Sequence, residues 1–322
     1  MSLLRNPQVL LLLLAIILLA LTFTRPTLEL ERPTYRYVFV FDISQSMNVM
    51  DVPNTDASIS RLDFAKKMTL DAISELPCGT EAGLALFTGH RAFLLITPIE
   101  VCSNHREFSS IINNINWKMT WKARSEIAKG LYKSISLLKL LSEEKEDHND
   151  KDEPDPARLV FITDGHEAPP INPEAPPRFA GKTGDIKGLV VGVGDTKPVP
   201  IPKFDKEGKQ NGFWKVDEVQ HTDFNTQVKQ QQEGIKATSG TEHLSSLKEA
   251  YLKGLSEKTG LKYHRLDNAK ALSDQMKSKS LSNSKTITTD MRWFFALCGL
   301  LAFVSTLLIA PVKKYLHLLS LK

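Results

Sequence analysis

The stretch that decides the fold is "YRYVFVFDISQSMNVMD", residues 35–51. Its first seven residues are mostly apolar or aromatic, which is typical of a strand buried on both faces of a sheet. Asp42 ends this run, and Ser44 and Ser46 follow at alternating positions. Asp and Ser commonly end strands through turn chemistry. Their oxygens are also hard ligands for Mg²⁺ or Ca²⁺, so the rest of the sequence must decide between a turn and a cation site.

Apolar runs and helical patterns alternate along residues 35–280. This alternation predicts an α/β fold, a three-layer Rossmann-like domain whose mostly parallel central sheet is covered by helices on both faces. Residues 142–157 are expected to be a mobile acidic loop, because 142–156 is densely charged and lacks residues that could pack into a core. The predicted strands are 35–41, 158–164, 187–195 and 261–268 with a hairpin at 82–97, and the predicted helices are 60–76, 104–115, 125–141, 243–260 and 269–279.

Acidic side chains follow several of these strands. Asp164 comes after "RLVFIT", and Asp195 ends "GLVVGVGD". In open α/β sheets the working groups lie in loops at the carboxyl ends of the strands, so Asp42, Asp164 and Asp195 are expected to converge if their strands are neighbours. Asp51 is interpreted as a polar loop residue, Asp195 as a strand-end turn, and His166 as a surface residue.

The pattern Asp-x-Ser-x-Ser after a buried strand, with a strand and "TDG" downstream, resembles the von Willebrand factor A (VWA) family. The resemblance covers residues 35–280 and implies a VWA domain with a metal-ion-dependent adhesion site (MIDAS). Carried over to this sequence, Asp42, Ser44 and Ser46 match the first metal-binding loop, and Asp164 matches the third.

The second metal-binding loop departs from the family pattern. In that family a Thr usually stands before a helix in a frame such as G-T-x-I-x-x-A-L. The matching stretch here is "RSEIAKGL", so Ser125 takes the Thr position and Arg124 replaces the Gly. Thr120 is the alternative ligand. The resemblance implies a divalent cation, with Mg²⁺ favoured over Ca²⁺ or Mn²⁺, that attracts an acidic residue of a protein partner.

Other functions fit the sequence less well. The net charge of +4 gives no reason to expect nucleic-acid binding. A phosphatase of the Asp-x-Asp type needs a second carboxylate where Ser44 stands, and the chain has no G-x-S-x-G elbow of a serine hydrolase. The expectation is therefore a protein-interaction module and not an enzyme, with a hydrolase as the less favoured alternative.

Both ends of the chain are apolar. Residues 8–24 and 292–312 are expected to form transmembrane helices, since each apolar segment is close to the roughly 20 residues that cross a bilayer. A cleaved signal peptide is the alternative for the first. Positive charges at both ends favour a cytoplasmic N-terminus at 1–7 and tail at 313–322. The linker 25–34, the domain 35–280 and a tether at 281–291 would then lie in the periplasm of a bacterial inner membrane.

Cys78 and Cys102 bracket the predicted hairpin at nearly equal distances from its turn. In an oxidising compartment this arrangement makes a disulfide plausible, with two free thiols as the alternative.

The arrangement of two spans around such a domain resembles the BatA/BatB group of bacterial membrane proteins, which implies an envelope-stress or adhesion role. The stretches "FDISQSMNV" and "PIPKFDKEGKQNGFWK" (200–215) further resemble MxaL-type proteins of methanol-oxidation gene clusters. That resemblance implies a maturation or calcium-insertion factor for a periplasmic methanol dehydrogenase, with the dehydrogenase, its accessory proteins and a MoxR-type AAA+ ATPase as expected partners.

Overall fold

The computed structural model describes residues 7–53, 59–120, 124–146, 156–172, 174–222, 228, 232 and 240–319. The chain divides into two compact units. One is Thr34–Asn283, and the other combines Met1–Pro33 with Ser284–Lys322. Each is described separately below.

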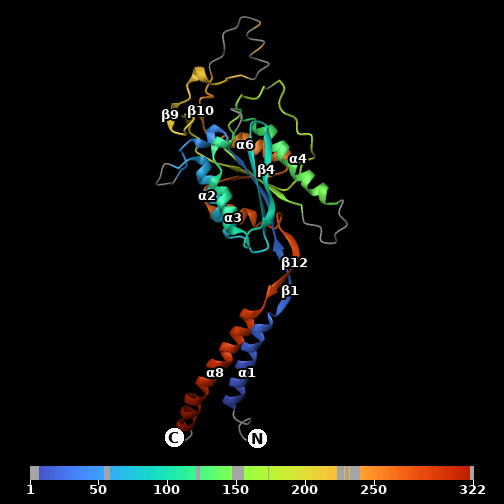
Figure 1. Cartoon of the computed structure of the whole chain (residues 1–322), viewed down its shortest axis with the longest axis vertical. Helices are drawn as coiled ribbons and strands as arrows, with labels where there is room; N and C mark the ends of the chain where they lie inside the picture. Colours follow the sequence, from blue (N-terminus) through green and yellow to red (C-terminus); the bar gives the residue numbers. More distant parts are fainter. Residues whose placement is uncertain are drawn as a thin grey trace. The chain divides into compact units, whose positions relative to one another are not determined.

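The larger unit is built on a six-stranded mixed sheet (Figure 1). All seven residues of the central strand β2 (Arg36–Asp42) are buried, as its apolar sequence predicts. In this sheet every strand pair is parallel except β3 (Glu81–Thr88) with β4 (Arg91–Glu100), which form the antiparallel hairpin predicted around Gly89. The strand order is β11 (Lys262–Arg265), β6 (Gly188–Gly192), β5 (Arg158–Thr163), β2 (Arg36–Asp42), β3 (Glu81–Thr88) and β4 (Arg91–Glu100).

Helices cover both faces of this sheet, and the side chains of β2 alternate between the two layers. Tyr37, Phe39 and Phe41 pack into one core with α2 (Arg61–Ser74), α3 (His105–Asn114) and α7 (Ala269–Met276). Val38 and Val40 pack into the other core with α4 (Ile127–Glu146) and α6 (Glu249–Thr259). The three-layer α/β architecture predicted from the sequence is confirmed.

Helix boundaries follow local capping chemistry. Ser60 caps α2, since its hydroxyl accepts from the backbone N–H of Asp63 at 3.0 Å. Gly260 ends α6 in the left-handed region at φ 80°. Helix α4 runs on to Glu146, so the start of the predicted acidic loop 142–157 is helical instead, whereas residues 147–155 lie outside the described residues.

The hairpin β3–β4 brings the two cysteines together. Glu81 pairs with Glu100 at the open end of the hairpin, and Cys78 and Cys102 lie just beyond this pair. They are joined by a disulfide with their Cα atoms 5.5 Å apart.

Between β6 and α6 the chain leaves the sheet and forms what we call the roof, residues 196–222 and 240–245. It contains β7 (Val199–Pro200), β8 (Pro202–Phe204), β9 (Gln210–Phe213), η5 (Val216–Glu218) and β10 (Leu244–Ser245), with β7 paired to β10 and β8 to β9. Strand β8 packs against η3 (Gln45–Asn48), the short helix that follows β2. The ring of Phe204 packs against Trp117, which lies in η4 (Trp117–Met119). The roof is therefore attached to two other loops of the larger unit.

The smaller unit consists of two packed helices and a two-stranded sheet. Helix α1 (Pro7–Leu21) leads through η2 (Thr22–Thr24) to β1 (Thr27–Thr34), which pairs with β12 (Asn283–Asp290) ahead of α8 (Arg292–Leu319). The segments expected to be a linker and a tether thus contain paired strands, in keeping with the threonines and isoleucine of "KTITTD". Gly299 lets the two helices approach, because a Cβ there would lie 3.2 Å from Leu19.

Among the described residues, Pro7–Thr24 alone is long and apolar enough to cross a membrane by length and composition. The apolar part of α8 within the described residues, Arg292–Leu308, is shorter than that criterion requires. The expected second span at 292–312 therefore stays a prediction.

Candidate metal site

The first predicted loop forms a compact cluster of oxygens at the carboxyl end of β2. Asp42 is the last residue of the strand and is fully buried. Its Oδ1 accepts from the backbone N–H of Ser44 at 2.9 Å, and its Oδ2 accepts from the hydroxyl of Thr163 at 2.6 Å. The hydroxyl oxygens of Ser44 and Ser46 lie 3.1 Å apart. The three residues of the Asp-x-Ser-x-Ser pattern thus present their oxygens together.

Asp164 joins this cluster because β5 lies beside β2 in parallel register, with Phe41 opposite Ile162. Its carboxylate is fully buried and accepts a hydrogen bond from the Ser46 side chain. Its Oδ1 also accepts from the backbone N–H of His166 at 2.9 Å. Residues more than a hundred positions apart in the sequence therefore meet at one edge of the sheet, as the strand-end rule predicts.

Ser125 is fixed at the start of α4 by backbone hydrogen bonds to the loop after β5. Its N–H donates to the carbonyl of Ala168 at 2.7 Å, and its carbonyl accepts from the Ala168 N–H at 2.8 Å. The Ser125 hydroxyl is buried and has no hydrogen-bond partner among the described residues. Thr120, the alternative ligand, instead makes a hydrogen bond with the hydroxyl of Thr88.

The two buried carboxylates have opposite pKa shifts. Burial and the nearby negative charge of Asp164 raise the pKa of Asp42 to about 7. Burial would also raise the pKa of Asp164, but Arg61, His166 and the hydrogen bonds from His166 and Ser46 together outweigh it and hold that pKa below its usual value. Without a cation beside it, Asp42 therefore tends to keep its proton.

Arg61 is a buried member of the site that the sequence did not reveal. Its side chain is fully buried, and its Nη1 donates to Asp164 Oδ2 at 2.6 Å and to the Ser245 hydroxyl at 2.7 Å. Its Nε donates to Asp51 Oδ1 at 2.8 Å. A Cβ at Gly194 would lie 2.4 Å from this Nε. Asp51 is thus a loop residue, as predicted, and its carboxylate forms a buried ion pair with Arg61 that the sequence did not reveal.

The same network fixes both ends of the roof to the site. Before the roof, the backbone N–H of Asp195 donates to Asp51 Oδ2 at 3.2 Å. At its end, the Ser245 hydroxyl donates to Asp164 Oδ2 at 3.0 Å. The roof is therefore held by the same side chains that order the acidic cluster.

His166 is also buried, with 3% of its surface exposed, so its interpretation as a surface residue was wrong. Its Nε2 lies 3.8 Å from a carboxylate oxygen of Glu242 in the roof, and its Nδ1 has no hydrogen-bond partner among the described residues. Burial lowers the pKa of His166, with Asp164 opposing the shift. The signal missed was its position two residues after Asp164, inside the loop that builds the site.

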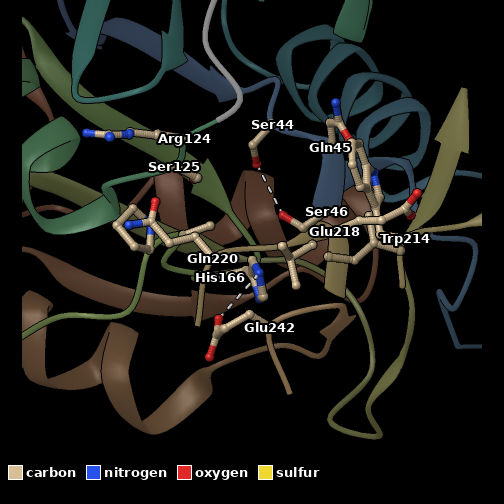
Figure 2. A pocket seen from close by; sticks show the side chains of 14 residues that line it. Ser44, Gln45, Ser46, Arg124, Ser125, His166, Trp214, Glu218, Gln220 and Glu242 are labelled. Atoms are coloured by element: carbon tan, nitrogen blue, oxygen red, sulfur yellow. Dashed lines mark hydrogen bonds and ion pairs between the residues drawn. The ribbon is translucent and has the colours of Figure 1, made fainter. Parts of the chain in front are cut away.

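A cavity of about 290 Å³ lies over the hydroxyl cluster (Figure 2). Ser44, Ser46 and Ser125 line it from the sheet edge, whereas Thr120 does not line it. The remaining lining residues come from the loops nearby and from the roof: Gln45, Arg124, His166, Ala168, Pro169, Ile201, Trp214, Glu218, Val219, Gln220 and Glu242.

The oxygens present fit a hard divalent cation. The three serine hydroxyls are neutral donors on one cavity, and the unpartnered Ser125 hydroxyl is the kind of buried polar atom that a bound ion satisfies. The carboxylates of Asp42 and Asp164 lie directly behind them, with most of their hydrogen-bonding capacity already used. Direct ligation by hydroxyls and support by the carboxylates through water is the arrangement that this geometry allows.

Comparison with known proteins agrees with this architecture. Residues 37–166 match the family model of the von Willebrand factor type A domain. The matched range contains all the predicted ligands, while the roof lies outside it. The larger unit therefore has an α/β VWA-like fold with a mixed central sheet.

Relatives with similar sequences are UPF0353 proteins of mycobacteria. One from Mycobacterium sp. (strain KMS) is 29% identical over 174 residues, which is 53% of this chain and 47% of the relative. Another from Mycobacterium bovis is 28% identical over 218 residues, 66% of this chain and 57% of the relative. The chain spans about half the length of the curated relatives it matches.

Two solved structures resemble the chain at low sequence identity. An aerotolerance-related membrane protein from Bacteroides fragilis is 17% identical with a TM-score of 0.45, covering 74% of this chain and 94% of that one. The manganese-loaded TRAP protein of Plasmodium vivax is 11% identical with a TM-score of 0.34, covering 82% of each chain.

Proposed function

We propose that the chain is a membrane-anchored, divalent-cation-dependent protein-interaction module that binds an acidic residue of a partner. The ion would be held by Ser44, Ser46 and Ser125, with Asp42 and Asp164 behind them, and Mg²⁺ is the favoured ion over Ca²⁺ or Mn²⁺. VWA domains commonly bind a divalent metal, and the domain match spans every one of these residues.

The observation that carries the proposal is the donor set on the cavity. Three serines with neutral hydroxyls line it, while the carboxylates of Asp42 and Asp164 are occupied by Thr163, Arg61 and backbone donors. A divalent cation bound by neutral ligands keeps much of its positive charge, so it attracts an external carboxylate into an open coordination position. This supports recognition without bond cleavage, and we propose that the chain is not an enzyme.

The membrane part of the proposal rests on the apolar ends. Pro7–Thr24 has the length and composition of a span, and α8 begins with the apolar stretch Arg292–Leu308 packed against α1. We propose that both helices cross a bacterial inner membrane and that the VWA-like unit lies in the periplasm. The disulfide between Cys78 and Cys102 is in keeping with an oxidising compartment.

The narrower hypotheses concern the partner. A maturation role for methanol dehydrogenase, with a MoxR-type ATPase nearby, rests on two short stretches of sequence alone. The general envelope-stress or adhesion role needs only the cation site and an acidic partner. We therefore propose the general role, and gene neighbourhood would discriminate between the two.

Titration calorimetry of the full chain with Mg²⁺ tests the proposal. Asp42→Ala should weaken Mg²⁺ binding at least about tenfold, because the hydrogen-bonded carboxylate behind the hydroxyls orders the site. Asp71→Ala is the matched control, since Asp71 is an exposed aspartate on α2 far along the helix from Arg61. Equal affinity in Asp42→Ala and Asp71→Ala would rule out the proposed site.

A further inference from the structure

The roof determines the shape of the cavity above the hydroxyl cluster, and it lies outside the stretch that matches the VWA family model. Its ends are tied to Asp51 and Asp164 by the hydrogen bonds of Asp195 and Ser245. Its β8–β9 hairpin is held against η4 by the contact of Phe204 with Trp117 and by a hydrogen bond from Lys118 to the Glu207 carbonyl at 2.8 Å. The cavity wall is thus held by contacts within the chain itself.

The size of the cavity limits what can enter. At about 290 Å³ it lies at the lower end of small-ligand sites, which span roughly 300–1,000 Å³. A flat protein surface cannot enter a cavity of this size. A projecting acidic side chain with its immediate neighbours can.

The cavity has an apolar part beside its polar lining. Ile201, Trp214 and Val219 line it from the roof, and Ala168 and Pro169 line it from the loop after β5. The indole Nε1 of Trp214 is buried and has no hydrogen-bond partner among the described residues, so a backbone carbonyl of a ligand would satisfy it. Figure 2 shows Trp214 and Arg124 on opposite sides of the serine cluster.

The charges around the cavity disfavour a second acid beside the one that meets the cation. Arg124 lines the cavity next to Ser125, but Figure 2 shows its guanidinium pointing away from Ser44 and Ser46. On the roof side stand Glu218, which is paired with Lys203 at 2.6 Å, and Glu242, which lies 3.8 Å from His166. An acidic residue flanked by further acids would bring like charges against these two glutamates.

The geometry points to a specific occupant: an extended peptide segment of the partner in which a single aspartate or glutamate is flanked by an aliphatic residue. The carboxylate meets the cation at Ser44, Ser46 and Ser125, and the aliphatic side chain packs against Trp214 and Val219. This inference rests on the proposed function and adds the class of sequence that the site selects.

Three capped tripeptides test it against the Mg²⁺-loaded full chain in detergent, with binding followed by NMR titration. The probes are Ac-Leu-Asp-Leu-NH₂, Ac-Gly-Asp-Gly-NH₂ and Ac-Leu-Asn-Leu-NH₂, the last of which reports partition into detergent. The aspartate peptide with leucines should bind about tenfold more tightly than the one with glycines, because it buries apolar surface that glycine lacks. A chelator should abolish the binding of both.

Trp214→Ala should reduce the ratio of the affinities for the leucine and glycine aspartate peptides to about twofold or less, while the affinity for Mg²⁺ stays unchanged. Phe213→Ala is the matched control, since Phe213 is the neighbouring aromatic residue, is 51% exposed and does not line the cavity. Val219→Ala, a smaller change, should reduce the preference partly and serves if Trp214→Ala fails to fold.

The outcomes separate the two proposals. Absence of Mg²⁺ or Mn²⁺ binding to the wild-type chain overturns the proposed function and this inference with it. If the metal binds and both aspartate peptides bind equally, or neither binds, only the peptide selection is overturned. A leucine preference that persists in both Trp214→Ala and Val219→Ala also contradicts it.

Discussion

Removing the guanidinium of Arg61 should destabilise the larger unit more than removing the charge of Lys66 on the same helix. In Arg61→Met the carboxylates of Asp51 and Asp164 lose their counter-ion. Water cannot replace it, because these side chains are only 8% and 0% exposed. Breaking a buried ion pair by removing one partner costs about 3–5 kcal/mol, because a charge is left buried without compensation. We expect a loss of unfolding free energy in that range.

Lys66→Met is the matched control on the same helix. Lys66 is also mostly buried, but its partner Asp63 is 56% exposed, and its other contact is the Ile115 carbonyl at 2.8 Å. Water can therefore solvate the acid that Lys66→Met leaves behind, so the expected loss is about 1 kcal/mol. The two variants differ in what the lost cation leaves unpaired.

Mg²⁺ adds a second readout to this comparison. The cation would bind next to Asp164 and replace part of the lost positive charge, so saturating Mg²⁺ should stabilise Arg61→Met by about 1 kcal/mol more than it stabilises the wild type. Urea unfolding of the full chain in detergent, with and without Mg²⁺, measures both effects. Equal losses in Arg61→Met and Lys66→Met, or no differential effect of Mg²⁺, would refute this reasoning.

Three further predictions concern stability. Burial raises the pKa of Glu167 to about 7, so between about pH 4.5 and 7 the unfolded chain releases a proton that the folded chain keeps. As the pH rises through this window, the unfolding free energy of the metal-free protein should therefore fall by up to about 3 kcal/mol. In Glu167→Gln, this contribution to the dependence of unfolding free energy on pH should be absent. Replacing both Cys78 and Cys102, which are 24 residues apart, by serine should lower the unfolding free energy in urea by about 3 kcal/mol. The disulfide itself should appear in mass spectrometry as a gain of two hydrogens when the native protein is reduced. Gly130→Ala should lower the unfolding free energy by about 1–3 kcal/mol, because the new Cβ would lie 2.0 Å from the Phe87 ring. Gly254→Ala on α6, where the new Cβ would meet open space, should be neutral or stabilising in the same urea unfolding measurement.

The central part of the fold was predictable because local and long-range requirements coincide there. The apolar run of β2 could only be buried on both faces, and Asp42 at its end could only lie at the carboxyl edge of the sheet. The same rule placed Asp164 beside it. Ser125 could be predicted as a ligand only because the stretch around it resembles the second metal-binding loop of the VWA family. Nothing in "ARSEI" by itself indicates a site residue.

The residues that were missed depend on contacts between distant segments. Arg61 follows a helix cap, where an arginine normally lies in solvent, and its partners Asp164 and Ser245 are 103 and 184 residues away. No local pattern distinguishes it from an exposed arginine. The burial of His166 depends likewise on the roof, which brings Glu242 over it.

The roof itself could not be predicted because its strands are only two to four residues long. Such short strands leave no hydrophobic periodicity to detect. Their position is determined instead by the contact of Phe204 with Trp117 and by the hydrogen bonds at Asp195 and Ser245. The strand pairing of residues 283–290 with β1 was missed for a similar reason, since its partner lies at the other end of the chain.

Locating a bound cation tests the central claim most directly. Crystals of the protein grown with Mn²⁺, measured at the manganese absorption edge, should give an anomalous peak at roughly 2.1–2.3 Å from the hydroxyl oxygens of Ser44, Ser46 and Ser125. Absence of a peak there at full Mn²⁺ saturation, or a peak held only by the roof carboxylates of Glu218 and Glu242, would contradict it.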